Sequence, residues 1–134
     1  MSRKRFHSKR QGAAAVEFAM TAGLAFFFFF AALEFCRVSM MRHTVQNALY
    51  EGARMGIVPG ATASDVENKA QSILSSIGVR DAQIDVTPDP ILIDSPEVTI
   101  RIQMALDRNL YAPSFFFKGL NLDRSYTMRR EVPN

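Results

Sequence analysis

The chain has 134 residues and a formal net charge of +3, which allows one compact domain and an appendage. Residues 1–12 hold five Lys and Arg and no acid, whereas the rest of the chain holds 11 Lys and Arg against 13 Asp and Glu. The basic balance therefore belongs to the N-terminal segment. A nucleic-acid-binding protein is not indicated, and no nucleic-acid partner is expected.

An apolar segment follows at residues 13–33. It contains one charged residue, Glu17, and an unbroken run of phenylalanines at Phe26–Phe30. About 20 predominantly apolar residues span the hydrocarbon core of a bilayer as a helix. A buried core helix is the alternative, but so small a domain could hardly surround this phenylalanine run on all sides. We therefore expect a transmembrane helix at residues 13–33.

The flanks of this segment predict its orientation. Residues 1–12 are expected to be a basic cytoplasmic leader, and the mixed charges of Glu34, Arg37 and Arg42 follow the segment. The positive-inside rule then places residues 34–134 outside the membrane. A cleaved signal peptide is not favoured, because the apolar stretch is longer than usual and lacks a small-residue cleavage site.

Few side chains point to chemistry. His7 and His43 stand apart, the carboxylates are scattered, and the sequence has no phosphate loop, nucleophile elbow or metal-ligand spacing. We expect no enzyme, no catalytic residue, no metal site and no cofactor. Cys36 is the single cysteine, and it either packs at the membrane boundary or forms an intermolecular disulfide.

Residues 34–56 have the pattern of an amphipathic helix, with apolar residues at steps of three and four. These residues are Val38, Met41, Val45, Leu49, Gly52 and Met55. Gly56 and Pro59 then end the pattern. We expect one helix from about Ala14 to Met55, whose second half is a stalk with an apolar stripe that needs a cover.

A second, short helix is predicted after a Pro-Gly turn, as the first element of a head at residues 57–134. Ser64 can cap this helix, Asp65 lies in its first turn, and Gly78 ends it. Its predicted buried face consists of Val66, Ala70, Ile73, Leu74 and Ile77.

Beyond residue 80 the period of the apolar residues changes to two, which is typical of half-buried strands. The alternating positions are Ile84 and Val86, then Val98, Ile100, Ile102, Met104 and Leu106, and more weakly Tyr126, Met128 and Arg130. The Pro- and Asp-rich connection 88–96 can add a short edge strand at Ile91–Ile93. We expect an α+β fold: a long N-terminal transmembrane helix continues as a stalk, and a small head adds a second helix and about three antiparallel strands.

The segment Leu110–Leu122 has more aromatic residues than is usual for a connection between strands. They are Tyr111, Phe115, Phe116 and Phe117. It either folds back into the core of the head, which we favour, or docks on a partner or on the membrane surface.

Glu17 is a functional candidate, because an ionisable residue within a membrane helix is costly. Taken alone, it could extend to the headgroups. However, Gly12 precedes it, four small or apolar residues from Ala13 lie between them, and Phe18 follows before the long apolar run. This pattern resembles the processing site of type IV prepilins of the Flp/Tad branch, in which Phe18 takes a position often held by tyrosine.

That resemblance implies cleavage between Gly12 and Ala13 by a membrane aspartic prepilin peptidase. It also implies that Glu17 meets the N-terminal amine of a neighbouring subunit during assembly. An ammonium is a natural partner for a carboxylate in a low-dielectric layer.

Two motifs of the stalk make the resemblance more specific, because they point to one family of prepilin-like proteins. Leu33–Arg37 and Gln46–Arg54 are similar to the Glu-Phe/Gly-Arg and Asn-Ala…Glu-Gly-Ala-Arg elements of TadE-like proteins. The motif residues are Glu34, Arg37, Asn47, Glu51, Gly52 and Arg54. The resemblance covers residues 10–56 and implies a minor pilin or pseudopilin, which differs from the major Flp pilin by its head.

Two features of the stalk leave alternatives open. Ala48, Gly52 and Gly56 form a small-residue face that either receives another helix or, as we favour, packs and caps the helix under the head. Glu51 and Arg54 can pair at i,i+3, which contributes only a few tenths of a kcal/mol. Their recurrence in the TadE-like pattern therefore hints at an interaction role rather than at stability.

The resemblance implies assembly of a Tad (Flp) type IV pilus, used for adhesion or secretion, at the bacterial inner membrane. The implied partners are membrane lipid, other pilin-like subunits along the N-terminal helix, the prepilin peptidase and the Tad inner-membrane assembly platform. The alternative is an uncleaved single-span anchor whose periplasmic head recruits an envelope partner. Processing at Gly12 distinguishes the two, because a plain anchor has no need of it.

Overall fold

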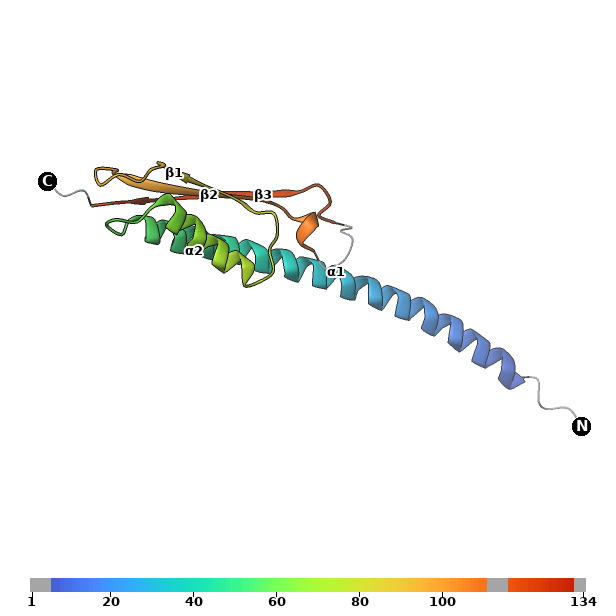
Figure 1. The fold of residues 1–134 in the computed structure, drawn as a ribbon. Helices are drawn as coiled ribbons and strands as arrows, with labels where there is room; N and C mark the ends of the chain where they lie inside the picture. The colour runs from blue at the N-terminus through green and yellow to red at the C-terminus, as the bar shows by residue number, and fades with distance from the viewer. Residues whose placement is uncertain (1–5, 111–115, 132–134) are drawn as a thin grey trace, which may run out of the picture. The chain divides into compact units, whose positions relative to one another are not determined.

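The computed structural model of the chain describes residues 6–110 and 116–131, with side chains from Gly12 onward (Figure 1). Its elements in chain order are helix α1 (Phe6–Gly56), helix α2 (Ala63–Ser75), strand β1 (Gln83–Thr87), strand β2 (Glu97–Ala105), the 3₁₀ helix η1 (Asp107–Asn109) and strand β3 (Asn121–Arg129). They confirm the predicted α+β fold with a long apolar helix, a second helix and three antiparallel strands. The chain divides into two compact units, Met1–Cys36 and Arg37–Asn134, and α1 contributes to both.

Helix α1 begins at Phe6, earlier than the predicted start near Ala14. Lys and Arg are good helix formers, and no proline lies between residues 6 and 56, so nothing in the basic segment ends the helix. Among the described side chains of the unit Met1–Cys36, none is buried. The apolar surface of this unit therefore needs an environment that the described chain does not supply.

In the unit Arg37–Asn134, α1 buries one stripe of side chains. The buried apolar residues are Val38, Met41, Val45, Ala48, Leu49, Gly52, Ala53 and Gly56. They confirm the predicted stripe as far as Gly52. Met55 was also predicted for it but is 38% exposed, because Gly56 takes the inner position four residues after Gly52.

Helix α2 is capped by Thr62, so the prediction of Ser64 was wrong. Thr62 Oγ1 accepts a hydrogen bond from the Asp65 N–H at 3.2 Å, and the Asp65 carboxylate accepts one from the Thr62 N–H at 2.9 Å. This reciprocal pair is a capping box. Hydrogen bonds from the hydroxyl and then the N–H of Thr62 lower the pKa of Asp65. Gly78, with a φ of +68°, closes the turn after the helix as predicted.

The predicted buried face of α2 is largely confirmed. Its buried residues are Ala63, Val66, Ala70 and Leu74, with Ile73 and Ile77 partly buried beside them. This face packs in the same core as the stripe of α1.

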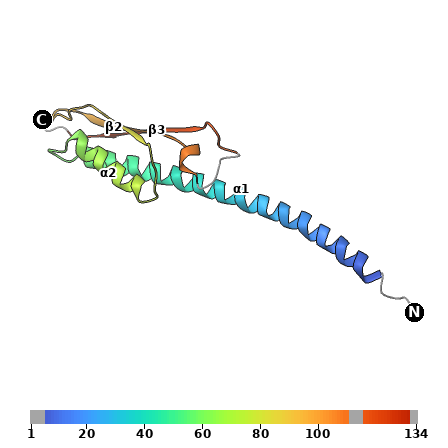
Figure 2. The same ribbon diagram turned by 45° about the vertical axis from the view of Figure 1, so that its right-hand side comes forward.

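The sheet has the strand order β1-β2-β3, and both pairs are antiparallel. Figures 1 and 2 show α2 and the C-terminal part of α1 on the same face of this sheet. The buried side chains of the central strand β2 are Val98, Ile100, Ile102 and Met104. Their alternation confirms the clearest of the predicted strands. At the edge, Tyr126 of β3 meets Tyr50 of α1 edge-to-face, with ring centroids 6.0 Å apart.

The connection between β1 and β2 does not form the short edge strand considered at Ile91–Ile93. The Leu92 N–H donates to Ser95 Oγ at 3.0 Å, and its carbonyl oxygen accepts from Arg130 Nη1 at 2.7 Å. Both main-chain groups of Leu92 are therefore engaged outside a strand ladder.

Gly52 and Gly56 allow α1 to approach the sheet closely. A Cβ on Gly52 would lie 2.8 Å from Ile100 Cδ1. A Cβ on Gly56 would lie 2.8 Å from Val98 Cγ1 and 3.1 Å from Val66 Cγ2. The small-residue face is thus filled within the fold, which supports the packing interpretation over an external helix.

The aromatic segment before β3 agrees in part with each of its two interpretations, packing in the core and exposure to a partner or membrane surface. Phe117 is buried in the core, whereas Phe116 and Leu120 are 47% and 49% exposed. Tyr111 and Phe115 lie outside the described residues.

Candidate functional site

The first candidate site is the apolar surface of α1 at residues 13–33. Each phenylalanine of Phe26–Phe30 is between 54% and 63% exposed. The helix is long and apolar enough to cross a membrane, and none of its most apolar 18-residue window is buried. This full exposure distinguishes it from the core helix of a soluble domain. A surface of this kind suits lipid or the helices of other membrane proteins.

The predicted processing and assembly residues lie at the N-terminal end of this surface. Gly12 is open, since a Cβ built on it would meet no atom within 4 Å. Glu17 is exposed, and its main-chain carbonyl accepts a hydrogen bond from Thr21 Oγ1 at 2.9 Å. Phe18 is 74% exposed. Ala13 and Glu17 are four residues apart, which places them on one face of the helix.

The Gly12–Ala13 peptide bond lies within α1. A glycine inside a helix destabilises it by about 1 kcal/mol relative to alanine, so Gly12 weakens the helix locally. Local opening of the helix at this bond therefore costs less free energy than it would at an alanine.

Three of the stalk motif residues face solvent at least in part. Asn47 and Arg54 are exposed, and Glu51 is half-buried. Arg54 Nη1 lies 3.9 Å from Glu51 Oε1, which confirms the predicted i,i+3 ion pair. Because 67% of the Arg54 side chain is exposed, this pair contributes little to stability. These residues remain available to a partner.

Of the other stalk motif residues, Arg37 and Gly52 turn inward. Glu34 is half-buried, and Gly52 packs against the sheet and α2 as described above. Arg37 is only 4% exposed, and its Nε donates a hydrogen bond to the main-chain carbonyl of Asn109 at 3.1 Å. Part of the motif therefore serves the folding of the head.

Asn109 extends this contact into a network. Its Oδ1 accepts from the Arg80 N–H at 2.7 Å, and its Nδ2 donates to the carbonyl oxygens of Arg80 at 3.1 Å and Ala105 at 2.9 Å. Asn109 is 5% exposed. No periodicity in the sequence marks Asn109 for this role. For Arg37 a signal exists: it lies four residues before Met41, in line with the apolar stripe.

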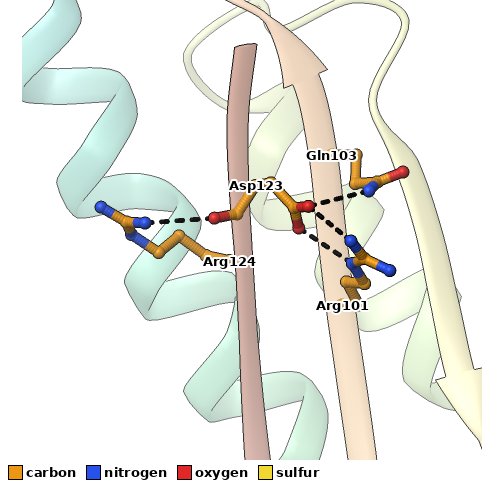
Figure 3. Close-up of polar contacts among 4 residues, drawn as sticks. All are labelled: Arg101, Gln103, Asp123 and Arg124. Atoms are coloured by element: carbon orange, nitrogen blue, oxygen red, sulfur yellow. Dashed lines mark hydrogen bonds and ion pairs between the residues drawn. The ribbon is translucent and has the colours of Figure 1, made fainter.

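A charged cluster lies on the sheet face opposite the helices. Asp123 of β3 accepts hydrogen bonds from Arg101 Nε at 2.9 Å and from Gln103 Nε2 at 3.0 Å, both on β2 (Figure 3). The bonds from Arg101 and then Gln103 lower the pKa of Asp123 to about 2, and Asp123 in turn raises the pKa of Arg101. Arg124 Nη1 donates to the Asp123 carbonyl at 3.2 Å from the other side of the strand. The cluster joins β2 to β3 and offers no group poised for catalysis.

Within the described part of the chain, no group of three or more His, Cys, Asp or Glu side chains is placed to hold a metal ion. The Cys36 thiol is free and exposed. Neither feature adds a second candidate site.

One family model, described as TadE-like protein, matches residues 12–54. The match begins at Gly12 and ends at Arg54, so it spans the proposed processing site, the apolar segment and both stalk motifs. No curated protein and no solved structure matches the chain. The match confirms the resemblance to TadE-like proteins over these residues.

Proposed function

We propose that this TadE-like chain is a minor pilin or pseudopilin that acts in the assembly of a Tad (Flp) type IV pilus, used for adhesion or secretion. The observation that carries the proposal is the exposed apolar surface of α1 directly after Gly12, with Glu17 as its single charge at residues 13–33. The family match over residues 12–54 supports the same assignment.

The apolar segment anchors the chain in the inner membrane as a single span. The basic residues of 1–12 hold the N-terminus in the cytoplasm, and the unit that begins at Arg37 lies on the periplasmic side. The exposed phenylalanines contact lipid before assembly and the helices of other subunits after it.

Processing between Gly12 and Ala13 creates the group that Glu17 needs. Hydrolysis leaves a carboxylate on Gly12, which departs with the leader, and an ammonium on Ala13. The ammonium of one subunit then pairs with the Glu17 carboxylate of its neighbour. In a medium of low dielectric constant an unpaired carboxylate is strongly disfavoured, so this pairing favours association in a defined register.

The partners follow from these steps. The prepilin peptidase acts on Gly12 and Ala13, and other pilin-like subunits contact α1 along residues 13–33. The Tad inner-membrane platform assembles the subunits. The exposed motif residues Asn47 and Arg54, with the half-buried Glu51, are the part of the stalk that a neighbouring subunit reaches.

A second function is supported by the inward-facing motif residues. Arg37 and Gly52 make contacts that stabilise the fold, so their place in the family motif does not require contacts between subunits of a filament. On this alternative the chain is an uncleaved single-span anchor, and its periplasmic head recruits an envelope partner.

The N-terminus of the protein purified from native membranes tests the first function against the second. Mass spectrometry should find a chain that begins at Ala13. The variant Gly12→Leu should accumulate as uncleaved precursor in the membrane fraction. Gly23→Leu is a matched control, since Gly23 is also helical and a Cβ on it would meet nothing within 4 Å. Normal processing of Gly12→Leu, or an uncleaved native chain, would reject the pilin assignment.

A further inference from the structure

The turn Phe116–Leu120 presents apolar side chains outward at a fixed place. Phe117 enters the core, whereas Phe116 and Leu120 are about half exposed, at 47% and 49%. Lys118 lies between them and is exposed. Two apolar groups and an ammonium thus share one short surface segment, which is a combination typical of membrane interfaces.

The turn is held by one internal hydrogen bond and one to Asp107 of η1. The Leu120 N–H donates to the Phe117 carbonyl at 3.3 Å, and the Gly119 N–H donates to Asp107 Oδ2 at 3.1 Å. Gly119 has a φ of +72°, a conformation that favours glycine. The main chain of the turn is therefore held in place, so little backbone entropy is lost when the turn binds.

Three successive hydrogen bonds connect this turn to Arg37. Arg37 Nε donates to the Asn109 carbonyl at 3.1 Å, and the Asn109 N–H donates to the Leu106 carbonyl at 3.0 Å. The Leu106 N–H then donates to the Leu120 carbonyl at 2.9 Å. Figure 2 shows η1 and the start of β3 at the same end of the sheet. The turn is therefore tied to α1 at the first residue of the second unit.

Arg37 lies four residues after Leu33, the last residue of the apolar segment, which is about 6 Å along a helix. The headgroup layer on each side of a bilayer is about 5–7 Å thick. Arg37 itself is therefore expected at the level of the lipid headgroups when residues 13–33 span the bilayer.

We propose that the turn Phe116–Leu120 is a second membrane contact, in which Phe116 and Leu120 enter the periplasmic leaflet and Lys118 meets lipid phosphates. The proposal rests on the membrane anchor of the proposed function. Its consequence is that lipid holds the head at two points, and release of both accompanies the transfer of the subunit from the bilayer into a filament.

The chain contains no tryptophan, so single substitutions provide specific fluorescent probes. Phe116→Trp reports on the turn, and Phe28→Trp reports on the anchor. Ile93→Trp is the matched control, because Ile93 is more exposed, at 77%, but adjoins the other end of β2. That nine-residue strand is about 30 Å long. Each full-length variant is reconstituted in vesicles of phosphatidylcholine and phosphatidylglycerol, with and without bromine on the upper part of the acyl chains.

Phe116→Trp should show blue-shifted emission, strong quenching by the brominated lipid and protection from iodide. Ile93→Trp should be quenched by iodide and not by the lipid. If Phe116→Trp behaves as Ile93→Trp does, or resists both quenchers because protein covers it, the lipid contact is rejected while the anchor stands. If Phe28→Trp escapes the brominated lipid as well, the anchor fails and the proposed function with it.

Discussion

Arg37 Nε donates a hydrogen bond to the main-chain carbonyl of Asn109, 72 residues further along the chain, and both residues are almost fully buried. Arg37 is the first residue of the second unit and belongs to the stalk motif, whereas Asn109 ends η1. The contact therefore ties α1 to the segment between β2 and β3. A charged donor in such a place stabilises the fold only while its acceptors are present.

Arg37→Met should destabilise the head by about 2–3 kcal/mol, because a buried carbonyl loses a charged donor. Arg42→Met, an exposed position on the same helix, should change the free energy of unfolding by less than about 0.5 kcal/mol. Urea unfolding of the full chain in detergent, followed by near-UV circular dichroism, measures the difference. The three tyrosines all lie after residue 37, so the tyrosine band of this spectrum, read apart from the phenylalanine bands, reports on the unit Arg37–Asn134. Equal stability of the two variants would contradict a structural role for Arg37.

The strands illustrate what sequence patterns can and cannot predict. In β2 every second residue is apolar and buried, so periodicity alone identified Val98–Met104. In β3 only Leu122 is buried, because this edge strand carries polar side chains on both faces. The pattern therefore indicated just its C-terminal half, from Tyr126. An edge strand forms largely because it pairs with its neighbour. The sequence of the edge strand alone does not reveal that pairing.

The candidate site shows the same division. Gly12, Glu17 and the apolar run are contiguous, so their spacing along the chain is enough to identify them. The burial of Arg37 was not predicted, because arginine is mostly exposed in proteins and its partner Asn109 is distant in sequence. Ser64 was predicted as the cap, but residue type alone does not identify a cap, since Thr62 is also of a type that can cap a helix. The reciprocal partner Asp65, three residues after Thr62, decides between them.

Substitution of the two packed glycines should separate their roles. Gly56→Ala places a methyl group 2.8 Å from Val98 Cγ1, and the branched side chain of Val98 is stiff. Overpacking costs typically about 1–3 kcal/mol, which outweighs the gain of about 1 kcal/mol in helix propensity. Gly52→Ala meets only the terminal Cδ1 of Ile100 at such a distance, so it should be closer to neutral.

Thermal unfolding of both glycine variants in the same detergent gives the comparison. We expect a lower Tm for Gly56→Ala and a smaller change for Gly52→Ala. Gly23→Ala, in open surroundings within the apolar segment, serves as control and should leave the Tm nearly unchanged. A stabilising effect of Gly56→Ala would show that Val98 and Val66 give way, and that α1 does not depend on a glycine there.

Asp123 should make the stability of the head sensitive to acid. Its pKa falls from 3.8 to about 2 in the folded protein, chiefly through the hydrogen bonds from Arg101. The folded state then binds this proton less readily than the unfolded state. The contribution is fully present above pH 3.8 and is lost as the pH falls toward about 2.

Asp123→Asn removes this contribution. The difference in unfolding free energy between wild type and Asp123→Asn should be constant near neutral pH and shrink below pH 3.8. It should also shrink in high salt, because the pair is exposed. Asp94→Asn, in the exposed turn between β1 and β2, serves as control and should retain the wild-type acid response. A pH-independent difference for Asp123→Asn would contradict the ion pair with Arg101.

Glu17→Ala should separate membrane insertion from assembly. Insertion depends on the apolar residues of 13–33, and removal of a charge makes it more favourable, so the variant should remain in the membrane after alkaline extraction. Assembly should be lost, since the Ala13 ammonium of a neighbouring subunit no longer meets a carboxylate in the low-dielectric layer. Glu17→Asp retains the charge on a shorter side chain and should recover part of the assembly. Pilus yield in sheared fractions provides the measurement. Normal pili from Glu17→Ala would reduce Glu17 to a residue that merely extends to the headgroups.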